Sequence, residues 1–152
     1  MPVAEPQKEL RFTRTAQATL FCVVAAVAIM AGIVFFLLIP YRKEFPDLPH
    51  PAWGWLPILA GAGLLRLAYH CVKHAYLILT PLGIEIFPFF RPASGMQLVA
   101  WAQITGAEAE GSRLTLHFND EKTSGIHLSL GPIPAARRDL VTKAVLGRVA
   151  AH

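Results

Sequence analysis

Apolar positions dominate the first half of the chain, where residues 16–39 form a run of 24 positions without one charged side chain. An α-helix of this length reaches about 36 Å and can cross a hydrocarbon core of about 30 Å. A second, less pure apolar stretch, which contains Arg66, covers residues 55–73. Together they predict a transmembrane hairpin over residues 16–74. The four prolines of loop 40–54 predict a stiff, extended connection between the two helices.

In the second half of the chain, the spacing of apolar residues changes from helical to alternating. Alternation such as Leu114-Thr-Leu-His-Phe118 is typical of strands with one buried face. Five or six strands are predicted over residues 75–130, with a tight turn at Thr80–Gly83. An apolar stripe with helical spacing follows from residue 135. The sequence therefore predicts an α+β membrane protein, in which a two-helix transmembrane hairpin precedes a small antiparallel β domain over residues 75–152 with a C-terminal capping helix.

Basic residues are unevenly placed around the two apolar stretches. The side that holds the polar lead over residues 1–15 and the β domain has five of them near the predicted spans: Lys8, Arg11, Arg14, Arg66 and Lys73. The opposite side has only Arg42 and Lys43. For a multi-pass protein with these two spans, the positive-inside rule then predicts that both termini lie in the cytoplasm. Trp53 and Trp55 precede the second span and are predicted interface anchors.

Small residues recur in both predicted helices. The candidate packing positions are Ala25, Ala28 and Gly32 in the first helix and Gly61 and Gly63 in the second. Small side chains let helix backbones approach closely in lipid, where the hydrophobic effect does not drive association. The pattern fits a hairpin that packs on itself, and it also fits packing against a second copy or against a helix of another integral membrane protein.

Several segments of the second half carry a family resemblance. They are a strand–turn–Gly–strand opening over 77–86, a Trp-x-x-Ile element at Trp101 and Ile104, the strands 114–118 and 126–130, and the last helix. In these segments the chain resembles the bacterial pleckstrin-homology-like domains of small membrane proteins. The resemblance implies a curved antiparallel sheet or partly open barrel with a terminal helix at one end, and it implies no shared reaction. Lipid-binding relatives carry Lys and Arg around their first hairpin, whereas the turn at Thr80–Gly83 has no base.

Two groups of residues are candidates for binding lipid or a partner. Arg66, His70, Lys73 and His74 share one helix face, where they could hold anionic headgroups or carboxylates of a partner, or could simply snorkel at a helix end. The second group comprises Phe87, Phe89, Phe90 and Arg91 at the end of a predicted hairpin. These aromatic residues fit either the core of the domain or a contact with the membrane or a partner.

Catalytic chemistry finds little support in the sequence. His70 and His74 have the spacing of a metal pair but no third ligand nearby, and the motifs of serine hydrolases, P-loops and dinucleotide sites are absent from the sequence. His117 and His127 fall at outward positions of neighbouring strands, which favours solvated histidines over a pH-sensitive contact. We expect no enzyme activity, no metal and no cofactor.

The charge distribution points to the membrane as a partner. Residues 1–74 hold seven Lys and Arg against four Asp and Glu, whereas residues 75–152 hold seven against six. The second half shows no basic stripe with interleaved aromatic residues, so nucleic acid is not expected as a partner. The sequence therefore predicts a non-enzymatic, membrane-anchored interaction module, acting as an accessory subunit or as an assembly or scaffold factor of an inner-membrane complex. The alternative is a sensor of anionic phospholipid at the cytoplasmic leaflet.

Overall fold

In the computed structural model, which describes residues 8–152, the chain divides into two units. Residues 18–70 form a helical unit, and residues 8–17 and 71–152 together form a β unit. The β unit thus includes residues 71–74, which the sequence pattern placed in the hairpin, together with residues 8–15 of the N-terminal lead.

The helical unit contains most of two long helices, α1 (Thr15–Leu37) and α2 (Trp55–Lys73). The segments Thr15–Leu37 and Pro51–Lys73 are each long and apolar enough to cross a membrane. The connection is not extended as predicted, because it contains two short 3-10 helices, η1 (Ile39–Lys43) and η2 (Pro51–Gly54). Each of these turns has a proline in its first two positions, Pro40 in η1 and Pro51 in η2, where the fixed φ of proline fits and its missing N–H costs nothing.

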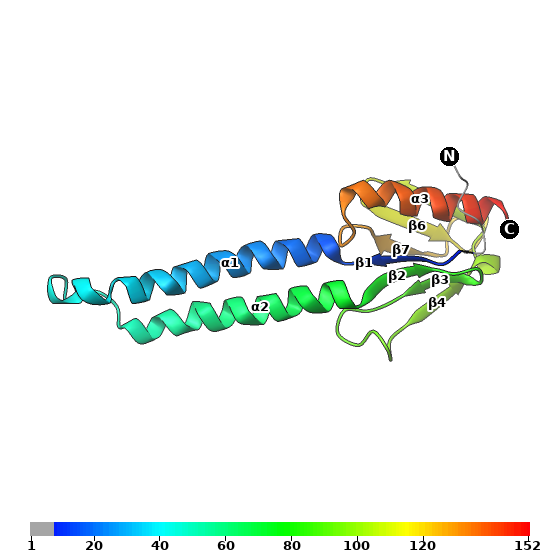
Figure 1. Ribbon diagram of the computed structural model, residues 1–152. Helices are drawn as coiled ribbons and strands as arrows, with labels where there is room; N and C mark the ends of the chain where they lie inside the picture. The colour runs from blue at the N-terminus through cyan, green and yellow to red at the C-terminus, as the bar shows by residue number, and fades with distance from the viewer. Residues whose placement is uncertain (1–7) are drawn as a thin grey trace. The chain divides into compact units, whose positions relative to one another are not determined.

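Small residues recur every seven positions along the contact between α1 and α2, which lie side by side (Figure 1). The buried positions are Ala18, Ala25 and Gly32 on α1, Gly54 at the end of η2, and Gly61 and Ala68 on α2. A Cβ atom added at Gly32 would lie 2.6 Å from the carbonyl oxygen of Gly54, so the two backbones are in close contact. Ala28 is half-buried, whereas Gly63 is exposed and a Cβ atom there would meet nothing within 4 Å. Gly63 therefore lies outside the contact between α1 and α2.

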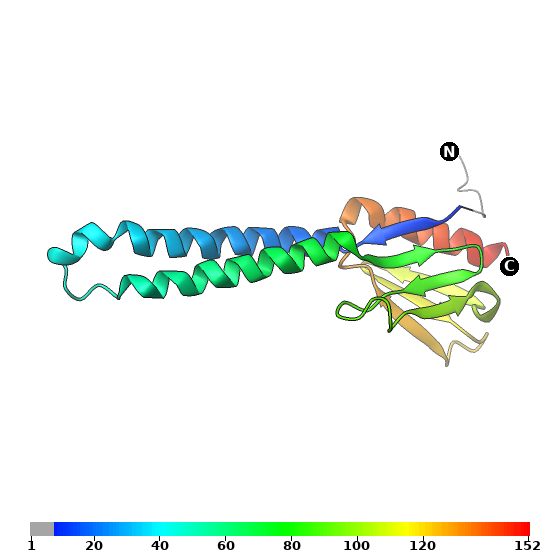
Figure 2. The ribbon, with the colours of Figure 1, turned by 60° about the horizontal axis from the view of Figure 1, so that its bottom comes forward.

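The β unit consists of two antiparallel sheets and one helix (Figures 1 and 2). The first sheet has the order β1-β2-β3-β4, made of Leu10–Thr13, Ala75–Leu79, Gly83–Ile86 and Gln97–Ala100. A 3-10 turn, η3 (Trp101–Gln103), leads to the second sheet, whose strands are β5 (Gly106–Glu110), β6 (Arg113–His117) and β7 (Gly125–Ser129). The helix α3 (Ala135–Ala150) packs against β5. The α+β class predicted from the sequence is confirmed.

The strands β1 and β5 are absent from the sequence prediction. In β1, Leu10 and Phe12 alternate with polar residues, but the signal covers only four positions and lies more than 60 residues from its partner β2. In β5, the sequence Gly-Ala-Glu-Ala-Glu consists of residues that are depleted in strands, so only the ladder with β6 explains its conformation.

The core lies between the two sheets and α3. One row across the first sheet brings Leu10, Leu79, Ile84 and Val99 together through the pairing of the four strands, and all but the half-buried Leu10 are buried. Leu114, Leu116 and Leu128 face them from the second sheet, and Val141 and Val145 complete the core from α3. Because these residues occupy alternate positions along the strands, the intervening side chains form the outer faces of the sheets.

Candidate functional site

The outer face of the first sheet carries a mixed row of apolar and charged residues. The register places Arg11, Ile78, Glu85 and Leu98 opposite one another across β1, β2, β3 and β4. Leu98 is 49% exposed, and β4 is the last strand on its side of the sheet. An exposed leucine beside an unpaired strand edge makes this side of the sheet a candidate contact surface.

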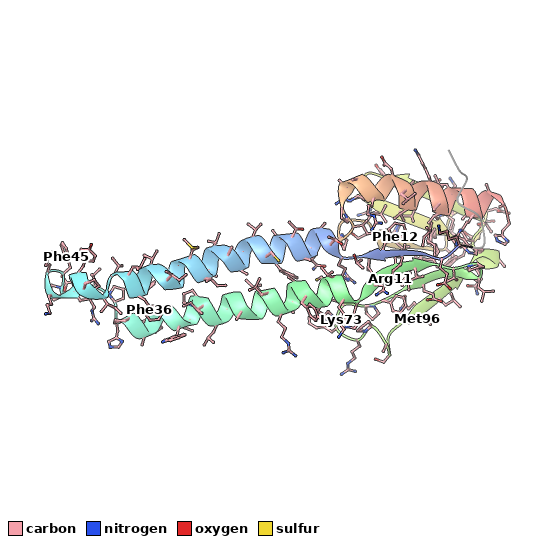
Figure 3. All side chains as sticks on the ribbon, viewed as in Figure 1. Arg11, Phe12, Phe36, Phe45, Lys73 and Met96 are labelled. Carbon is pink, nitrogen blue, oxygen red and sulfur yellow. The ribbon has the colours of Figure 1, made fainter. Side chains whose placement is uncertain are left out.

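A hollow of about 300 Å³ lies on this face, at the end of the β unit where residues 14–17 and 71–74 connect to the helices. We call this end the helix-connected end. The residues that line the hollow are Arg11, His74, Ala75, Ile78, Phe87, Pro92 and Ala93. Arg11 donates a hydrogen bond of 3.0 Å from Nη2 to the carbonyl oxygen of Lys73, which holds its guanidinium at this end (Figure 3). Within the described chain, the lining is therefore apolar with two basic groups and no carboxylate.

The loop between β3 and β4, residues 87–96, forms one wall of the hollow and is tied down by Arg14. Phe87 donates a backbone hydrogen bond of 2.9 Å to the carbonyl of Tyr76, and Arg14 Nη2 donates one of 3.2 Å to the carbonyl of Phe87. The Arg14 guanidinium also stacks 4.2 Å from the ring centre of Tyr76 and 5.6 Å from that of Phe89. Cation–π contacts of this kind strengthen as the cation is desolvated, and burial lowers the pKa of Arg14.

The aromatic residues of this loop lie outside the hydrophobic core. Phe90 is 84% exposed and packs edge-to-face on Phe89 with ring centres 4.9 Å apart. Phe87 and Phe89 are half-buried, and Arg91 is exposed. Of the two alternatives that the sequence left open, core or contact surface, this arrangement favours a contact surface.

No protein-family model, curated protein or solved structure matches the chain.

The four residues of the predicted basic stripe are divided between the two units. Arg66 and His70 belong to the helical unit, whereas Lys73 and His74 belong to the β unit. Arg66 and Lys73 are exposed, and His74 lines the hollow beside Phe87. The structure thus brings together one member of each predicted group.

The hollow also contains a residue that the sequence pattern did not single out as a binding residue. The sequence pattern used Arg11 only as one of the basic residues that predict the orientation of the chain in the membrane. The alternation of Leu10, Arg11, Phe12 and Thr13 is the signal that could have placed Arg11 on the outer face of a strand. The pairing of that strand with β2 depends on a contact between distant parts of the sequence.

The predicted interface anchors lie at the far end of the helical unit from its connection to the β unit. Trp53 and Trp55 are both more than half exposed. The ring of Trp55 makes an edge contact with Phe36, with ring centres 5.3 Å apart. This contact fixes one of the two indoles on the helical unit.

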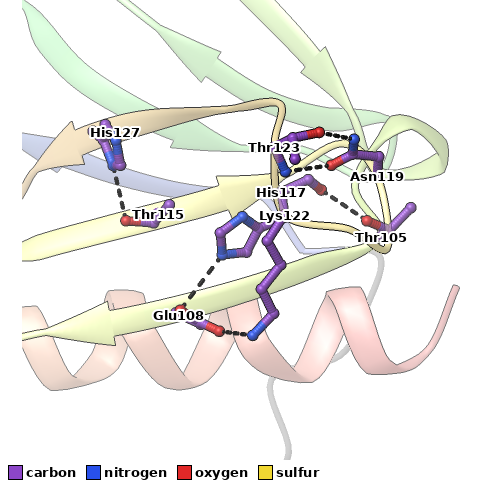
Figure 4. Close-up of polar contacts among 8 residues, drawn as sticks. All are labelled: Thr105, Glu108, Thr115, His117, Asn119, Lys122, Thr123 and His127. Carbon is purple, nitrogen blue, oxygen red and sulfur yellow. Dashed lines mark hydrogen bonds and ion pairs between the residues drawn. The ribbon is translucent and has the colours of Figure 1, made fainter.

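Figure 4 shows a polar cluster on the outer face of the second sheet, in which one of the two predicted solvated histidines is buried. His127 is exposed and lies 2.9 Å from the Thr115 hydroxyl, but His117 is buried, with 8% of its surface exposed. The prediction that both histidines are solvated is therefore wrong for His117. Its cross-strand partners are Gly106 and Gly125, and these glycines leave room for the imidazole to lie close against the sheet.

The imidazole of His117 faces a carboxylate. Its Nε2 lies 3.5 Å from Glu108 Oε2 and has no hydrogen-bond partner among residues 8–152. Lys122 donates a hydrogen bond to the other oxygen of Glu108, and this bond, followed by the charge of Lys122 and the contact with His117, lowers the pKa of Glu108. Groups of three or more potential metal ligands do not occur within residues 8–152.

Proposed function

We propose that the protein is a non-enzymatic, membrane-anchored interaction module that serves as an accessory subunit or assembly factor of a bacterial inner-membrane complex. Its two long helices support the anchoring. Their outer faces expose apolar side chains such as Val23, Val27, Leu59 and Leu65, which would be costly to hold in water. At 23 residues each, the two segments can reach about 35 Å.

The pairing of β1 with β2 supports an even number of spans. Arg14 donates a backbone hydrogen bond of 3.3 Å to the carbonyl of Cys71, so the two ends of the hairpin meet. Two spans that begin and end at one place return the chain to the side from which it entered. Both termini then lie on that side, for which the excess of basic residues favours the cytoplasm. Protease added to intact spheroplasts should leave the β unit uncut, and cleavage of the β unit would contradict this topology.

The observation that carries the proposed function is a group of exposed apolar residues between the β2–β3 turn and β4 of the β unit. Leu82, Phe90, Met96 and Leu98 are exposed and all belong to the segment from the β2–β3 turn to β4. The hollow with Arg11 and His74 opens on the same sheet. A surface that joins apolar residues, an unpaired strand edge and a few basic groups is typical of a protein contact site.

The chemistry of this surface indicates the kind of partner. Its basic groups favour a partner that presents a carboxylate beside an apolar segment, such as the juxtamembrane part of another integral membrane protein. The arrangement of a four-stranded sheet, a three-stranded sheet and a closing helix also supports the resemblance to pleckstrin-homology-like domains. We assign the partner contact to the outer face of the first sheet.

Photo-crosslinking in native membranes tests this assignment. A photoreactive phenylalanine at Leu98 should form an adduct with another protein, whereas the same residue at exposed Arg113, on the outer side of the second sheet, should not. The variant Leu98→Glu should also reduce co-purification of that partner in mild detergent, and Arg113→Glu should not. Absence of any adduct at Leu98, or equal adducts at both positions, would remove the proposal.

A second candidate function is binding of anionic phospholipid at the cytoplasmic leaflet. Arg11, Arg66, Lys73 and Arg91 are all exposed, and each base near an anionic surface contributes about 1 kcal/mol. The double variant Arg66→Gln and Lys73→Gln should then weaken the enrichment of phosphatidylglycerol around the protein in nanodiscs. Unchanged enrichment would end this alternative and leave the protein-contact proposal in place.

A further inference from the structure

We infer that the loop between β3 and β4, residues 87–96, is a wedge that inserts into the headgroup layer of the leaflet at which α1 begins and α2 ends. The inference rests on the proposed membrane span of the two helices. It goes beyond the proposed partner contact, because the ligand is the bilayer and the consequence is a fixed orientation of the β unit.

The base of the loop lies beside the two segments that connect the β unit to the long helices. Its first residue, Phe87, is bonded to the backbone of Tyr76, which lies three residues after the end of α2. The same residue accepts a hydrogen bond from Arg14, which directly precedes the start of α1. Figures 1 and 2 both show the loop at the helix-connected end of the β unit. The base of the loop is thus held next to the two points where the chain would meet the membrane surface.

The composition of the loop suits the surface of an anionic membrane. The loop reads Phe-Pro-Phe-Phe-Arg-Pro-Ala-Ser-Gly-Met, with one basic residue and no acidic one. Phe90 is 84% exposed, and the basic residue Arg91 is exposed beside it. Aromatic rings prefer the boundary between headgroups and acyl chains, and an adjacent arginine suits the phosphates above that boundary. The charge of the loop is therefore complementary to an anionic leaflet.

Contacts within the β unit hold the loop in one conformation before it meets the membrane. The ring of Phe89 lies between Arg14 and Phe90, and Gly95 donates a backbone hydrogen bond of 3.0 Å to the carbonyl of Arg91. The two prolines restrict the backbone further. A loop that already has its bound shape loses little conformational entropy when it inserts.

The tether to the helical hairpin favours lipid over protein as the ligand of the loop. The hairpin tethers the loop beside the bilayer, so its effective concentration at the membrane surface is high and even a weak insertion is populated. Leu82, which is 75% exposed, lies in the turn at the opposite end of β2 and β3 and has no such position. Leu82 is therefore a matched exposed apolar residue that should remain in water or contact a protein.

Tryptophan quenching by lipid tests the wedge in the full-length protein. The background variant carries Trp53→Phe and Trp55→Phe and keeps Trp101, which is 2% exposed and reports folding. Either Phe90→Trp or Leu82→Trp is then added, and the protein is placed in nanodiscs of phosphatidylcholine and phosphatidylglycerol. The quencher is phosphatidylcholine brominated near the headgroup end of its acyl chains.

We expect the bromolipid to quench the fluorescence added by Phe90→Trp at least about twofold more than that added by Leu82→Trp, with a blue-shifted emission only for the former. Quenching at position 90 that does not exceed the quenching at position 82 would overturn the wedge. A photoreactive residue at position 90 that captures a protein without such quenching would also overturn it and assign the loop to the partner surface. Because the crosslink at Leu98 is measured separately, failure of the wedge and failure of the proposed function are distinguishable.

Discussion

Arg148 of α3 is a buried charged side chain of the β unit, 6% exposed and without a carboxylate partner among the described residues. Its guanidinium donates hydrogen bonds of 2.8 Å to the carbonyl of Thr80 and 2.5 Å to that of Lys8. Trp101 donates a third hydrogen bond to the same Thr80 oxygen, and its ring lies 5.7 Å from the guanidinium. Arg148 therefore joins the N-terminal segment, the β2–β3 turn and α3.

Replacing this guanidinium by an ammonium should weaken the β unit. The variant Arg148→Lys keeps the charge but loses the planar pair of donors, so we expect the free energy of unfolding to fall by about 2 kcal/mol. Urea unfolding in detergent, followed by the fluorescence of Trp101 in the background without Trp53 and Trp55, measures this loss. The exposed Arg113→Lys variant is the control, and equal midpoints for the two variants would contradict the role of Arg148.

A second prediction at the residue scale concerns pH. The pKa of Glu108 is lowered from 4.5 in the folded protein, chiefly by the hydrogen bond from Lys122. The folded state therefore binds this proton less tightly than the unfolded state. The resulting stabilisation is present above about pH 4.5 and is lost as the pH falls through the lower folded pKa. It is a small contribution, because the carboxylate is on the surface.

Removing the Glu108 carboxylate should therefore lower the stability of the folded state at neutral pH and leave it unchanged in acid. We expect Glu108→Gln to lower the melting temperature at pH 7, and we expect the difference from the unchanged protein to close well below pH 4.5. Calorimetry across this range measures it, with Glu110→Gln as a control for the loss of one negative charge from β5. A difference that persists undiminished in acid would show that the effect does not come from ionised Glu108.

At the scale of elements, the close packing of α1 against α2 depends on glycines at the contact, because they have no side chain. A Cβ atom at Gly32 would lie 2.6 Å from the backbone oxygen of Gly54, which cannot move aside without displacing the helix. We expect Gly32→Ala to destabilise the hairpin by about 1–3 kcal/mol, measured by denaturant titration of the reconstituted protein with a distance probe across the two helices. Gly63→Ala, where the added atom meets nothing, should leave the hairpin as stable or slightly more stable. Equal effects would show that the close approach is not what holds the helices together.

Much of the secondary structure could be predicted from the sequence because its signals are local. The predicted spans 16–39 and 55–73 agree closely with α1 and α2, since a long, mainly apolar run has few other stable forms. The turn at Thr80–Gly83 also forms, with a backbone hydrogen bond of 2.9 Å that Thr80 donates to Gly83. The prediction failed where tertiary contacts decide. The alternation over residues 97–104 predicts one strand, but the strand ends at Ala100 and Trp101–Gln103 form a 3-10 turn, from which the Trp101 indole reaches the Thr80 carbonyl.

The same distinction holds for the candidate site. The group Phe87–Arg91 could be found from its composition, because three phenylalanines within four positions, followed directly by an arginine, stand out in the sequence. The contribution of Arg11 and Arg14 could not be found this way, because it follows from the antiparallel pairing of β1 with β2 across 60 residues of intervening chain. The basic stripe from Arg66 to His74 has good helical spacing, yet its members fall in different units of the protein.

At the scale of the whole molecule, the helical hairpin is an insertion between two neighbouring strands of one sheet. β1 precedes the hairpin and β2 follows it, and the two pair directly in the register Leu10 with Leu79 to Thr13 with Ala75. Phe12 from β1 is 2% exposed in the core, beside Leu77. A fragment that begins at residue 75 would therefore lack a core side chain and a complete edge of its sheet.

This organisation predicts which fragments fold. Residues 8–17 joined through a short Gly-Ser turn to residues 71–152 should give a soluble, folded β unit, because Arg14 and Cys71 already meet at the junction. Residues 75–152 alone should be unfolded or aggregated. Loss of a buried phenylalanine costs about 3–5 kcal/mol, a large part of the stability of a small domain, and the unpaired β2 becomes an exposed edge.

Size-exclusion chromatography and the dispersion of amide NMR signals separate these outcomes. The joined fragment carrying Phe12→Ala should lose dispersion, whereas the same fragment carrying Phe90→Ala should keep it, because Phe90 is exposed and Phe12 is buried. A well-dispersed spectrum from residues 75–152 alone would show that β1 contributes little. The N-terminal strand would then serve only to bring the first helix to the β unit.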